Sequence, residues 1–432
     1  MKDSGIDWIG KIPDEWEIEK GKRIFAQRNE RGNKINLELL SPTQKYGVIP
    51  QTLYEELTTY SAVKLKEGTD LSQLKTVHKG DYCISLRSFQ GGFEYSKYEG
   101  VVSPAYQIFY AIKNIDECYY KYLFKDQTFI AKMNSFTMSL RDGKNIAFSD
   151  FGNTYIPLPP LSEQTKIANF LDKKCAQIDS IIEESKKSIE EYKSWKQSVI
   201  FEAVTGKNLS CKKKDSGIEW LGEIPEEWEV QRLKSYFNFK KGLPITKENL
   251  EDSGISVISY GQIHSKNNNG VSICNELIRF VDKSYLKSNS ESLVKKGDFI
   301  FADTSEDLEG CGNCAYVNSD EIIFAGYHTI IFSSKYQNEN KYLAYLFLTD
   351  AWRTQIRCNC SGVKLFSITK KILSKVSIIL PPISEQESVA KALDAKCAQI
   401  DSLISEKQSL IKDLAEYKKS LIFEAVTGKR RV

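Results

Sequence analysis

The sequence has no long apolar run and little net charge, and both absences limit what the chain can be. No stretch approaches the roughly 20 consecutive apolar residues of a bilayer-spanning helix. The start, MKDSGIDWIG, lacks the apolar core of a signal peptide. We therefore expect a cytoplasmic protein. A net charge of +3 over 432 residues neither demands nor excludes nucleic acid as a partner, so the placement of Lys and Arg has to decide.

Residue patterns for catalysis are also scarce. The three histidines, His78, His264 and His328, are not at helical ligand spacing, and no Gly-x-x-x-x-Gly-Lys-(Ser/Thr) phosphate loop occurs. The segments LPPL and LPPI lack the polar first residue and the aromatic last residue that an amino-methyltransferase uses to hold its flipped base. We expect a chain that is not an enzyme by itself and that needs no cofactor.

Ten cysteines are spread over both halves without the dense framework of a small secreted domain, which favours reduced thiols. Four of them, Cys311, Cys314, Cys358 and Cys360, have a spacing that four zinc ligands could adopt. The first half has no counterpart to this cluster. We expect no metal, and zinc at these four thiols is the alternative.

Internal repetition is the strongest pattern in the sequence, and it indicates two copies of one unit. KDSGIDWIGKIPDEWEI at 2–18 returns as KDSGIEWLGEIPEEWEV at 214–230. Three further segments return at a constant offset of 222 residues: PPLSEQ at 159–164 as PPISEQ at 381–386, CAQIDS at 175–180 and 397–402, and FEAVTGK at 201–207 and 423–429.

The end of each copy is predicted to form a long helix. Each Pro-Pro pair precedes a candidate N-cap, Ser162 or Ser384, and Gly206 and Gly428 are natural C-terminal stops. Each helix would run for about 40 residues, or about 60 Å. Apolar residues recur at three- and four-residue steps, at Leu171, Ile178, Ile182, Ile189, Tyr192, Leu393, Ile400, Ile404, Ile411 and Leu414. An ordinary helical bundle would also have such a stripe, but two matched helices favour an antiparallel coiled-coil spacer.

The blocks between the repeats predict α+β domains with mainly antiparallel sheets. KGDYCIS at 79–85 parallels KGDFIFA at 296–302, and both are short strand-like runs that follow a Gly turn. Later in each block, the segments around Tyr122 and Tyr345 indicate a helix. The shared frame and divergent loops are typical of a scaffold that is kept while its binding surface changes.

The repeated motifs resemble the specificity subunit of type I restriction-modification systems over the whole chain. The resemblance rests on Ser-Gly-Ile-(Asp/Glu)-Trp-(Ile/Leu)-Gly-x-Ile-Pro-x-x-Trp, Leu-Pro-Pro-(Leu/Ile)-Ser-Glu-Gln and Glu-Ala-Val-Thr-Gly-Lys, each present twice. It implies two target recognition domains that each read one half of a bipartite sequence in double-stranded DNA. It also implies paired helices that dock two methyltransferase (modification) subunits, which motor-nuclease restriction subunits then join.

The expected fold is therefore two pseudo-symmetric globular domains separated by two long helices. The predicted divisions are the repeated motif (1–18), target recognition domain 1 (19–156), the central long helix (157–207), a linker (208–213), the second motif with target recognition domain 2 (214–376), and the C-terminal long helix (377–432).

Candidate DNA contacts lie in polar loops, because bases and phosphates are bound mainly by Arg, Lys, Asn, Gln and hydroxyl side chains. The candidates are Arg87, Gln90, Arg141, Lys144, Asn145, Lys240, Lys241, Lys247, Tyr260, Gln262, Lys266, Ser305, Ser361 and Lys364. The tryptophans of the repeated motif are expected to pack against the helices, because two different half-sites would not be read by identical residues. A helical scaffold whose globular arms bind other proteins is the alternative function.

Overall fold

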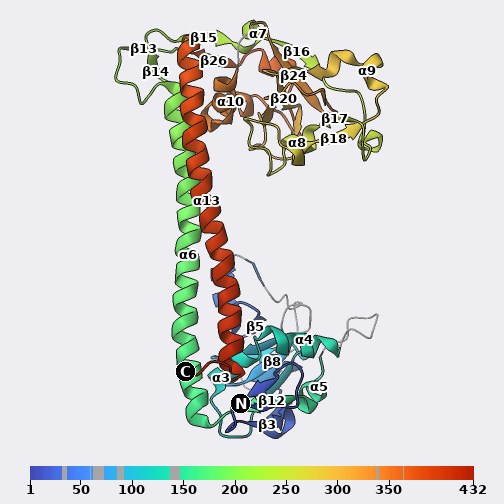
Figure 1. Cartoon of the computed structure of the whole chain (residues 1–432), viewed down its shortest axis with the longest axis vertical. Coiled ribbons are helices and arrows are strands. Elements are labelled where there is room, and N and C mark those ends of the chain that lie inside the picture. The colour runs from blue at the N-terminus through green and yellow to red at the C-terminus, as the bar shows by residue number, and fades with distance from the viewer. Residues whose placement is uncertain are drawn as a thin grey trace. The chain divides into compact units, whose positions relative to one another are not determined.

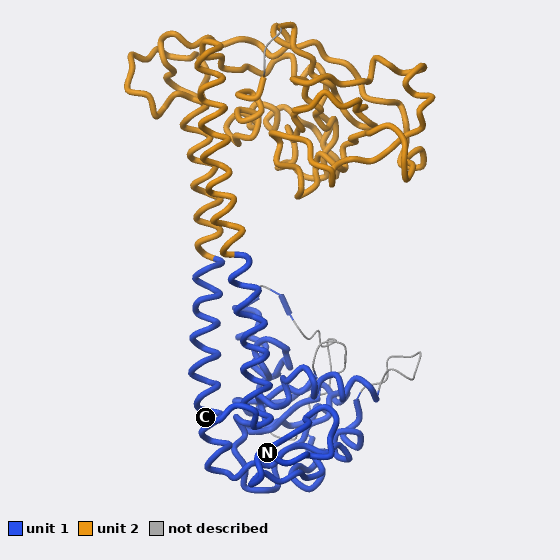
Figure 2. The backbone as a smooth tube through the Cα atoms, in the orientation of Figure 1, with its two compact units in different colours: residues 1–186, 408–432 blue, residues 187–407 orange. Residues whose placement is uncertain are grey.

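The computed structural model describes residues 1–31, 37–58, 60–61, 73–84, 92–136, 146–336, 340–362 and 364–432. The chain divides into two compact units (Figure 2). Unit 1 comprises Met1–Lys186 with Gln408–Val432, and unit 2 comprises Lys187–Lys407. Within the described part of the chain, no helix combines the length and apolar character needed to cross a membrane.

The main sheet of unit 1 has four antiparallel strands. Their order is β4 (Phe25–Arg28), β11 (Gln107–Ala111), β8 (Tyr82–Ile84) and β9 (Phe93–Tyr95). Adjacent strands place Phe25, Tyr82 and Phe109 together, with ring centroids 5.1–5.6 Å apart. Phe124, which follows α3 (Glu117–Leu123), closes this cluster from the helical side. The core of unit 1 is therefore largely aromatic.

Shorter elements complete unit 1 (Figure 1). They are β1 (Lys2–Asp3) with β2 (Lys11–Ile12), β3 (Glu17–Lys20) with β12 (Tyr155–Leu158), β5 (Leu40–Thr43) with β6 (Gly47–Pro50), β7 (Lys75–Val77) with β10 (Gly100–Val102), and the helices α1 (Gly21–Ile24), α2 (Gln51–Thr58), α4 (Gln127–Ser135) and α5 (Phe148–Asn153).

Unit 2 repeats the same sheet. Its order is β16 (Phe237–Lys241), β24 (Thr329–Ser334), β20 (Phe299–Ala302) and β22 (Cys314–Tyr316), again antiparallel throughout. Phe301 stacks on Phe332 with ring centroids 4.0 Å apart, and Trp352 of α11 (Asp350–Arg357) packs beside Phe301. The helix before it is α10 (Lys341–Leu348).

A second sheet enlarges unit 2. It has the order β18 (Arg279–Val281), β17 (Ile255–Ile258), β23 (Ile323–Ala325) and β19 (Leu293–Val294), and its β17–β23 pair is parallel. The remaining elements are β13 (Lys213–Asp215), β14 (Glu223–Pro225), β15 (Glu229–Arg232), β21 (Thr304–Ser305), β25 (Phe366–Ser367), β26 (Ser377–Leu380), α7 (Leu233–Tyr236), α8 (Tyr260–Ile263), α9 (Tyr285–Ser288), α12 (Lys370–Leu373), η3 (Lys247–Asn249), η4 (Asn275–Leu277) and η5 (Ser290–Ser292).

The predicted α+β class with mainly antiparallel sheets is confirmed in both units. The predicted helices around Tyr122 and Tyr345 are α3 and α10. Both long helices also form, as α6 (Leu161–Thr205) and α13 (Ile383–Val426). Glycines in the left-handed region follow their ends, Gly206 at φ 67° and Gly428 at φ 71°, as the predicted stops require.

The predicted N-caps at Ser162 and Ser384 are wrong. Each helix begins at the residue before the serine, directly after the Pro-Pro pair, so both serines are helical residues of the first turn and not caps. The carbonyl of Pro160 already accepts hydrogen bonds from the backbone N–H groups of Glu163 and Gln164. Proline fixes φ near the helical value and needs no N–H partner, so it can start a helix without a side-chain cap.

The two long helices pair antiparallel within each unit (Figure 1). In unit 1, Lys418 on α13 donates to Asp179 on α6 at 2.7 Å. In unit 2, Lys196 on α6 donates to Asp401 on α13 at 2.7 Å. The two aspartates come from the two CAQIDS segments, so the same interaction is made once in each unit.

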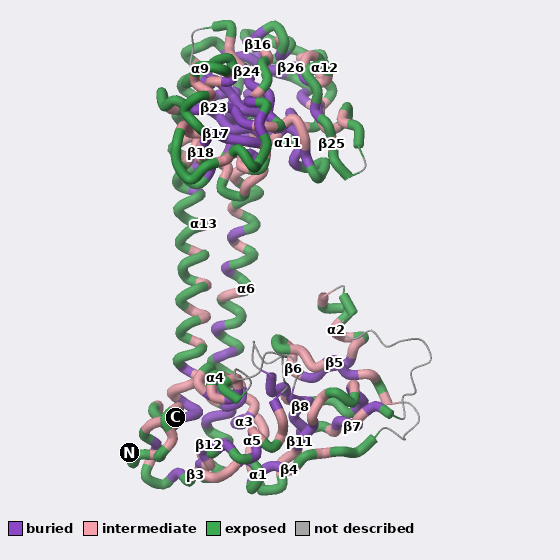
Figure 3. Tube along the Cα trace, turned by 90° about the vertical axis from the view of Figure 1, so that its right-hand side faces the viewer, coloured by how far each residue is buried: buried purple, intermediate pink, exposed green. Residues whose placement is uncertain are grey.

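The predicted apolar stripe lies between the helices. Leu171, Ile178, Ile189, Leu393 and Ile400 are buried. The other five members of the stripe are half-buried: Ile182, Tyr192, Ile404, Ile411 and Leu414. The outer faces of both helices are exposed, as Figure 3 shows in green. Packing against the partner helix therefore removes this stripe from water, as expected for helices that cannot bury it alone.

The end of α13 packs against the N-terminal motif within unit 1. Gly428, just after α13, lies against Pro13 and Trp16 of that motif. The hydroxyl of Tyr119 on α3 donates to the carbonyl of Val426 at 2.7 Å, and the indole of Trp16 donates to Glu163 in the first turn of α6 at 2.8 Å. Lys429 donates to the carbonyl of Ile9. The FEAVTGK segment that ends the chain is thus held by the segment that begins it.

Unit 2 makes the equivalent contacts, with the end of α6 and the start of α13. The hydroxyl of Tyr342 donates to the carbonyl of Val204 at 2.7 Å, and the indole of Trp228 donates to Glu385 at 3.0 Å. Trp16 and Trp228 are both buried. For these two tryptophans the expected packing against the helices is confirmed, whereas Trp8 packs edge-on against Phe129 of α4. Each FEAVTGK segment contacts one copy of the repeated motif.

Candidate nucleic-acid interface

Two loops of unit 2 that carry predicted contacts lie side by side. One joins β20 to β22 (residues 303–313) and the other follows α11 (residues 358–362 and 364–369); we call them the loop pair. Short strands hold them together, because Thr304 pairs with Ser367 and Ser305 with Phe366. The backbone N–H of Ile368 also donates to the carbonyl of Asp303 at 2.7 Å. Loops on a rigid sheet are common positions for binding residues.

The predicted contact residues of the loop pair differ in how far their side chains are exposed to solvent. Ser305 is 2% exposed, and its hydroxyl accepts the backbone N–H of Asp307 at 3.4 Å, so it organises its own loop. Ser361 and Lys364 are exposed, and Ser361 bridges to Ser367. Lys364 is therefore the member of this group with an exposed ammonium and no ion pair among the residues that the structure describes.

The predicted residues around α8 also separate into different roles. The side-chain oxygen of Gln262 accepts the backbone N–H of Ser259 at 3.1 Å, which commits that oxygen to capping the helix. Tyr260 packs edge-on against His264 and His328, with ring centroids 6.2 and 5.5 Å away. Lys266 is exposed.

The remaining candidates of unit 2 are exposed lysines elsewhere on the domain. Lys240 and Lys241 lie on β16, the edge strand of the main sheet, and Lys247 starts η3. These lysines suit phosphates better than bases, because an exposed ammonium is a flexible point charge. The candidates of unit 1 lie outside the described residues: Arg87, Gln90, Arg141, Lys144 and Asn145.

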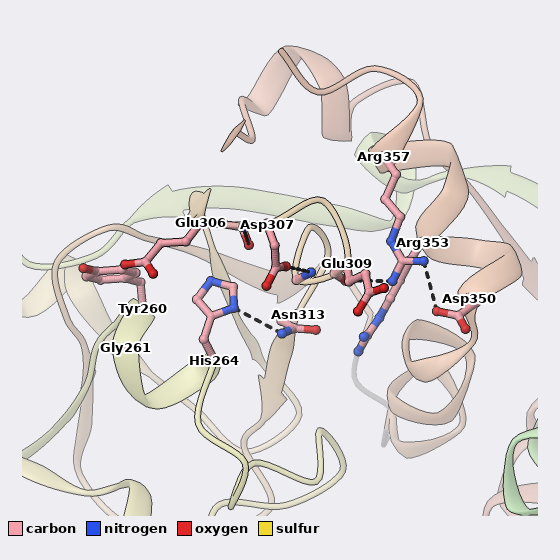
Figure 4. A pocket seen from close by; sticks show the side chains of 12 residues that line it. Tyr260, Gly261, His264, Glu306, Asp307, Glu309, Asn313, Asp350, Arg353 and Arg357 are labelled. Carbon is pink, nitrogen blue, oxygen red and sulfur yellow. Dashed lines mark hydrogen bonds and ion pairs between the residues drawn. The ribbon is translucent and has the colours of Figure 1, made fainter. Parts of the chain in front are cut away.

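A pocket of about 790 Å³ lies between α8, the β20–β22 loop and α11 (Figure 4). Its lining is Tyr260, Gly261, His264, Ser305, Glu306, Asp307, Glu309, Gly310, Asn313, Asp350, Arg353 and Arg357. The structure thus brings two predicted residues, Tyr260 and Ser305, to one site with several that the sequence did not single out. The four-residue spacing of Arg353 and Arg357 on one helical face was the signal that could have indicated part of it.

The two arginines of the pocket differ in their partners. Arg357 forms an ion pair with Asp350 at 3.0 Å and donates to the carbonyl of Glu309 at 2.7 Å. Arg353 donates through Nε to the carbonyl of Phe347 at 2.8 Å and has no ion pair among the described residues. Burial lowers the pKa of the Arg353 guanidinium. The opposite wall presents the carboxylates of the β20–β22 loop.

A hydrogen-bonded chain crosses the pocket. His264 Nε2 lies 2.8 Å from the carbonyl oxygen of Thr304, and His264 Nδ1 lies 3.1 Å from Asn313 Nδ2. Figure 4 shows the Asn313 amide with its nitrogen toward the ring and its oxygen turned away. Neither residue is among the predicted DNA contacts.

The cysteine cluster of unit 2 is divided between core and surface. Cys311 and Cys314 are buried, whereas Cys358 is exposed and Cys360 is half-buried. Burial raises the pKa of Cys311 and of Cys314 to about 12, which favours the thiol over the metal-binding thiolate. Among the described residues, no three His, Cys, Asp or Glu side chains come together as a metal site.

Known proteins of one family are similar to this chain. Residues 10–191 and 225–413 each match the family described as the type I restriction modification DNA specificity domain. The type I restriction enzyme MjaVIII specificity subunit of Methanocaldococcus jannaschii is 26% identical over 69% of this chain and 68% of that protein. The MjaIX specificity subunit of the same organism is 24% identical over 98% of this chain and 95% of that protein.

The fold has a solved counterpart as well. A chain from a structural study of complex assembly and conformational transition of the type I R-M system aligns with a TM-score of 0.74 at 15% identity. The alignment covers 97% of this chain and 100% of the other. With both halves matching the same family, the chain belongs to the type I restriction-modification DNA specificity domain family, of which it contains two copies.

Proposed function

We propose that the chain is the sequence-specific DNA-binding subunit of a type I restriction-modification complex, with each globular domain reading one half of a bipartite DNA target. The observation that carries this is the duplicated scaffold. The sheets β4-β11-β8-β9 and β16-β24-β20-β22 have the same order, while the loops that join their strands differ in sequence. A conserved frame with two different loop sets suits two different half-sites. The chain acts as the recognition component, and catalysis belongs to its partners.

The long helices are proposed to dock two methyltransferase subunits, which motor-nuclease subunits join. Several large apolar side chains on the helices are 38–50% exposed: Ile181 and Trp195 on α6, and Leu403, Leu410 and Tyr417 on α13. Ile181 and Leu403 occupy the same position of the repeat, as do Trp195 and Tyr417. Exposed apolar residues mark protein interfaces, and two of them at matching positions of each helix suit two identical partners.

The helices are also proposed to set the distance between half-sites. The 45 residues of α6 correspond to about 67 Å of helix, slightly less than two turns of B-DNA at about 34 Å per turn. Inserting residues into both helices by the same number is expected to lengthen the unspecified spacer of the DNA target without changing either half-site.

Exchange of one domain tests whether each domain reads one half of the DNA target. The chain is produced with its methyltransferase subunits, and the modified sequence is read by methylation-sensitive sequencing. Replacing residues 19–156 by the corresponding block of a relative is expected to change one half of the modified sequence and leave the other half and the spacer unchanged. A change in both halves contradicts the proposal. Wild-type protein that modifies no preferred sequence also contradicts it.

Point substitutions on the helices test the docking surface. Trp195→Glu and Tyr417→Glu are each expected to leave one bound methyltransferase subunit in place of two, as measured by light scattering after size exclusion. Lys187→Glu, at an exposed position of α6, is the matched control and is expected to leave two. Two bound subunits in both variants would refute this surface.

A further inference from the structure

The geometry points to Asn313 as a base-reading residue that recognises an adenine in the half-site bound by unit 2, with His264 fixing the orientation of its amide. This inference rests on the proposed function and deepens it. The supporting observation is the series of hydrogen bonds from Thr304 through His264 to Asn313 in the pocket of Figure 4.

The chain of hydrogen bonds determines which way the amide points. A backbone carbonyl can only accept, so His264 Nε2, 2.8 Å from the Thr304 carbonyl oxygen, must carry a hydrogen. In the neutral ring Nδ1 then has a lone pair and no hydrogen. The group 3.1 Å from Nδ1 must therefore be the amino end of the Asn313 amide. The hydrogen-bond partners thus decide which end of the amide is nitrogen and which is oxygen.

This orientation leaves an acceptor and a donor side by side. Asn313 Oδ1 accepts no hydrogen bond in the part of the chain that the structure describes, and one hydrogen of Nδ2 is not used by His264. The side chain is half-buried and lines the pocket. Adenine presents the complementary pair on its major-groove edge, an N6 amino donor beside the N7 acceptor, and a bidentate Asn is a common reader of it.

The charge of the pocket favours a base edge over a phosphate. Four carboxylates line it, from Glu306, Asp307, Glu309 and Asp350, against the two guanidiniums of Arg353 and Arg357. With a neutral imidazole the formal balance is 4 − 2 = 2 excess negative charges. A phosphate would be repelled, whereas the carboxylates are compatible with the exocyclic amino groups of bases.

The β20–β22 loop leaves room for the hydrogen bonds that join Thr304, His264 and Asn313. A Cβ added at Gly310 would lie 3.0 Å from His264 Nδ1 and 2.5 Å from the hydroxyl oxygen of Ser305. Any side chain there would compete with Asn313 for space beside the ring. The backbone of Asn313 is fixed as well, because its N–H donates to the Gly310 carbonyl at 3.0 Å and its carbonyl accepts from Ala302 at 3.2 Å. The amide is thus held before DNA arrives.

The test uses the full chain assembled with its methyltransferase subunits and a library of duplexes in which each position of the target is varied singly. Asn313→Ala is expected to reduce discrimination at one A·T position by roughly 5- to 150-fold, the range of a bidentate contact. The other positions of that half-site, and the whole of the half-site read by unit 1, are expected to keep their preferences. Asn275→Ala, at an exposed asparagine of η4, is the control and should change nothing.

Two further variants distinguish base reading from a structural role. Asn313→Asp has the same shape and keeps the acceptor while losing the donor, so we expect it to admit C·G at the same position through the cytosine N4 amino group. His264→Phe removes the orienting partner and is expected to weaken preference at that position alone. Thermal melting of each variant checks that it is folded.

The outcomes separate this inference from the proposed function. If wild-type complexes prefer one bipartite sequence and the Asn313 variants retain every preference, Asn313 is not a reader. A uniform loss of affinity across all positions, without a change in preference, would likewise overturn the inference. If the wild-type complex prefers no sequence, the proposed function itself fails.

Discussion

The contact between the end of each long helix and the repeated motif gives the sharpest stability prediction. Gly428 has φ 71°, and a Cβ placed on it would lie 2.3 Å from Pro13 Cδ and 3.1 Å from the Trp16 ring. Gly5, in the same unit, has nearly the same φ of 68°, but a Cβ there would meet nothing within 4 Å. Substituting each glycine by Ala therefore separates backbone strain from steric exclusion.

The expected magnitudes follow from these two terms. A left-handed conformation costs a non-glycine residue about 1–2 kcal/mol, which is the whole expected effect of Gly5→Ala. At Gly428 the forced contact with the proline and tryptophan rings adds about 1–3 kcal/mol, because both rings are packed and cannot withdraw freely. We expect Gly428→Ala to destabilise unit 1 by about 2–5 kcal/mol in total.

Calorimetry and hydrogen exchange together measure this effect. For a unit of this size, about 2–4 °C of melting temperature corresponds to each kcal/mol, so the two variants should be well separated. If the last turn frays before the unit melts, amides of residues 421–429 should exchange faster in Gly428→Ala and not in Gly5→Ala. Gly206→Ala is the equivalent change in unit 2, where a Cβ would lie 2.6 Å from Pro225.

Equal effects of Gly428→Ala and Gly5→Ala would refute the reasoning, because the steric term would then be absent. An effect of Gly206→Ala much smaller than that of Gly428→Ala would refute the claim that the two units use the same contact. The expected result is two large losses at the helix ends and one small loss at Gly5.

Three further predictions concern the core and the thiols. Ile400→Asp, at a fully buried position of α13, is expected to cost about 3–5 kcal/mol and to separate the helices, as seen in the urea midpoint and circular dichroism; an unchanged midpoint would exclude helix pairing through this residue. Tyr342→Phe leaves the carbonyl of Val204 without its buried donor and should cost about 1–3 kcal/mol in urea unfolding, whereas no loss would mean that water replaces the hydroxyl. Burial raises the pKa of Cys314 to about 12, so at pH 8 iodoacetamide should label the exposed Cys211 in the folded protein and Cys314 only after unfolding; equal labelling rates would contradict the burial.

The elements that the sequence predicted well are those specified by local pattern. The apolar stripe through Leu171 and Ile178 and the glycine stops have short periods or fixed chain positions, so they can be found without knowing the fold. The cap of each helix was placed two residues too late, at Ser162 in place of Pro160 and at Ser384 in place of Pro382. A serine after Pro-Pro looks like a cap, and only the backbone shows that Pro160 already provides the first turn's acceptor.

Most of the candidate site could not be found in this way. Its central hydrogen bonds join Thr304, His264 and Asn313. His264 directly follows α8, and the other two residues lie at the two ends of the β20–β22 loop. The amide of Gln262 was a reasonable candidate by residue type, yet its oxygen is turned to the backbone of Ser259. Whether a polar side chain caps its own helix or faces a ligand depends on a local competition that residue type does not settle.

The duplication, the long helices and the α+β class could be predicted from the sequence, because repeats and periodicity are properties of the chain alone. The tertiary structure decided what the identical FEAVTGK segments do. One forms the end of α6 and contacts the motif that comes just after it, and the other forms the end of α13 and contacts the motif at the start of the chain, as the Lys429 bond to Ile9 shows. Partners more than 400 residues apart are brought together only by antiparallel helix pairing, so no local pattern could have identified them.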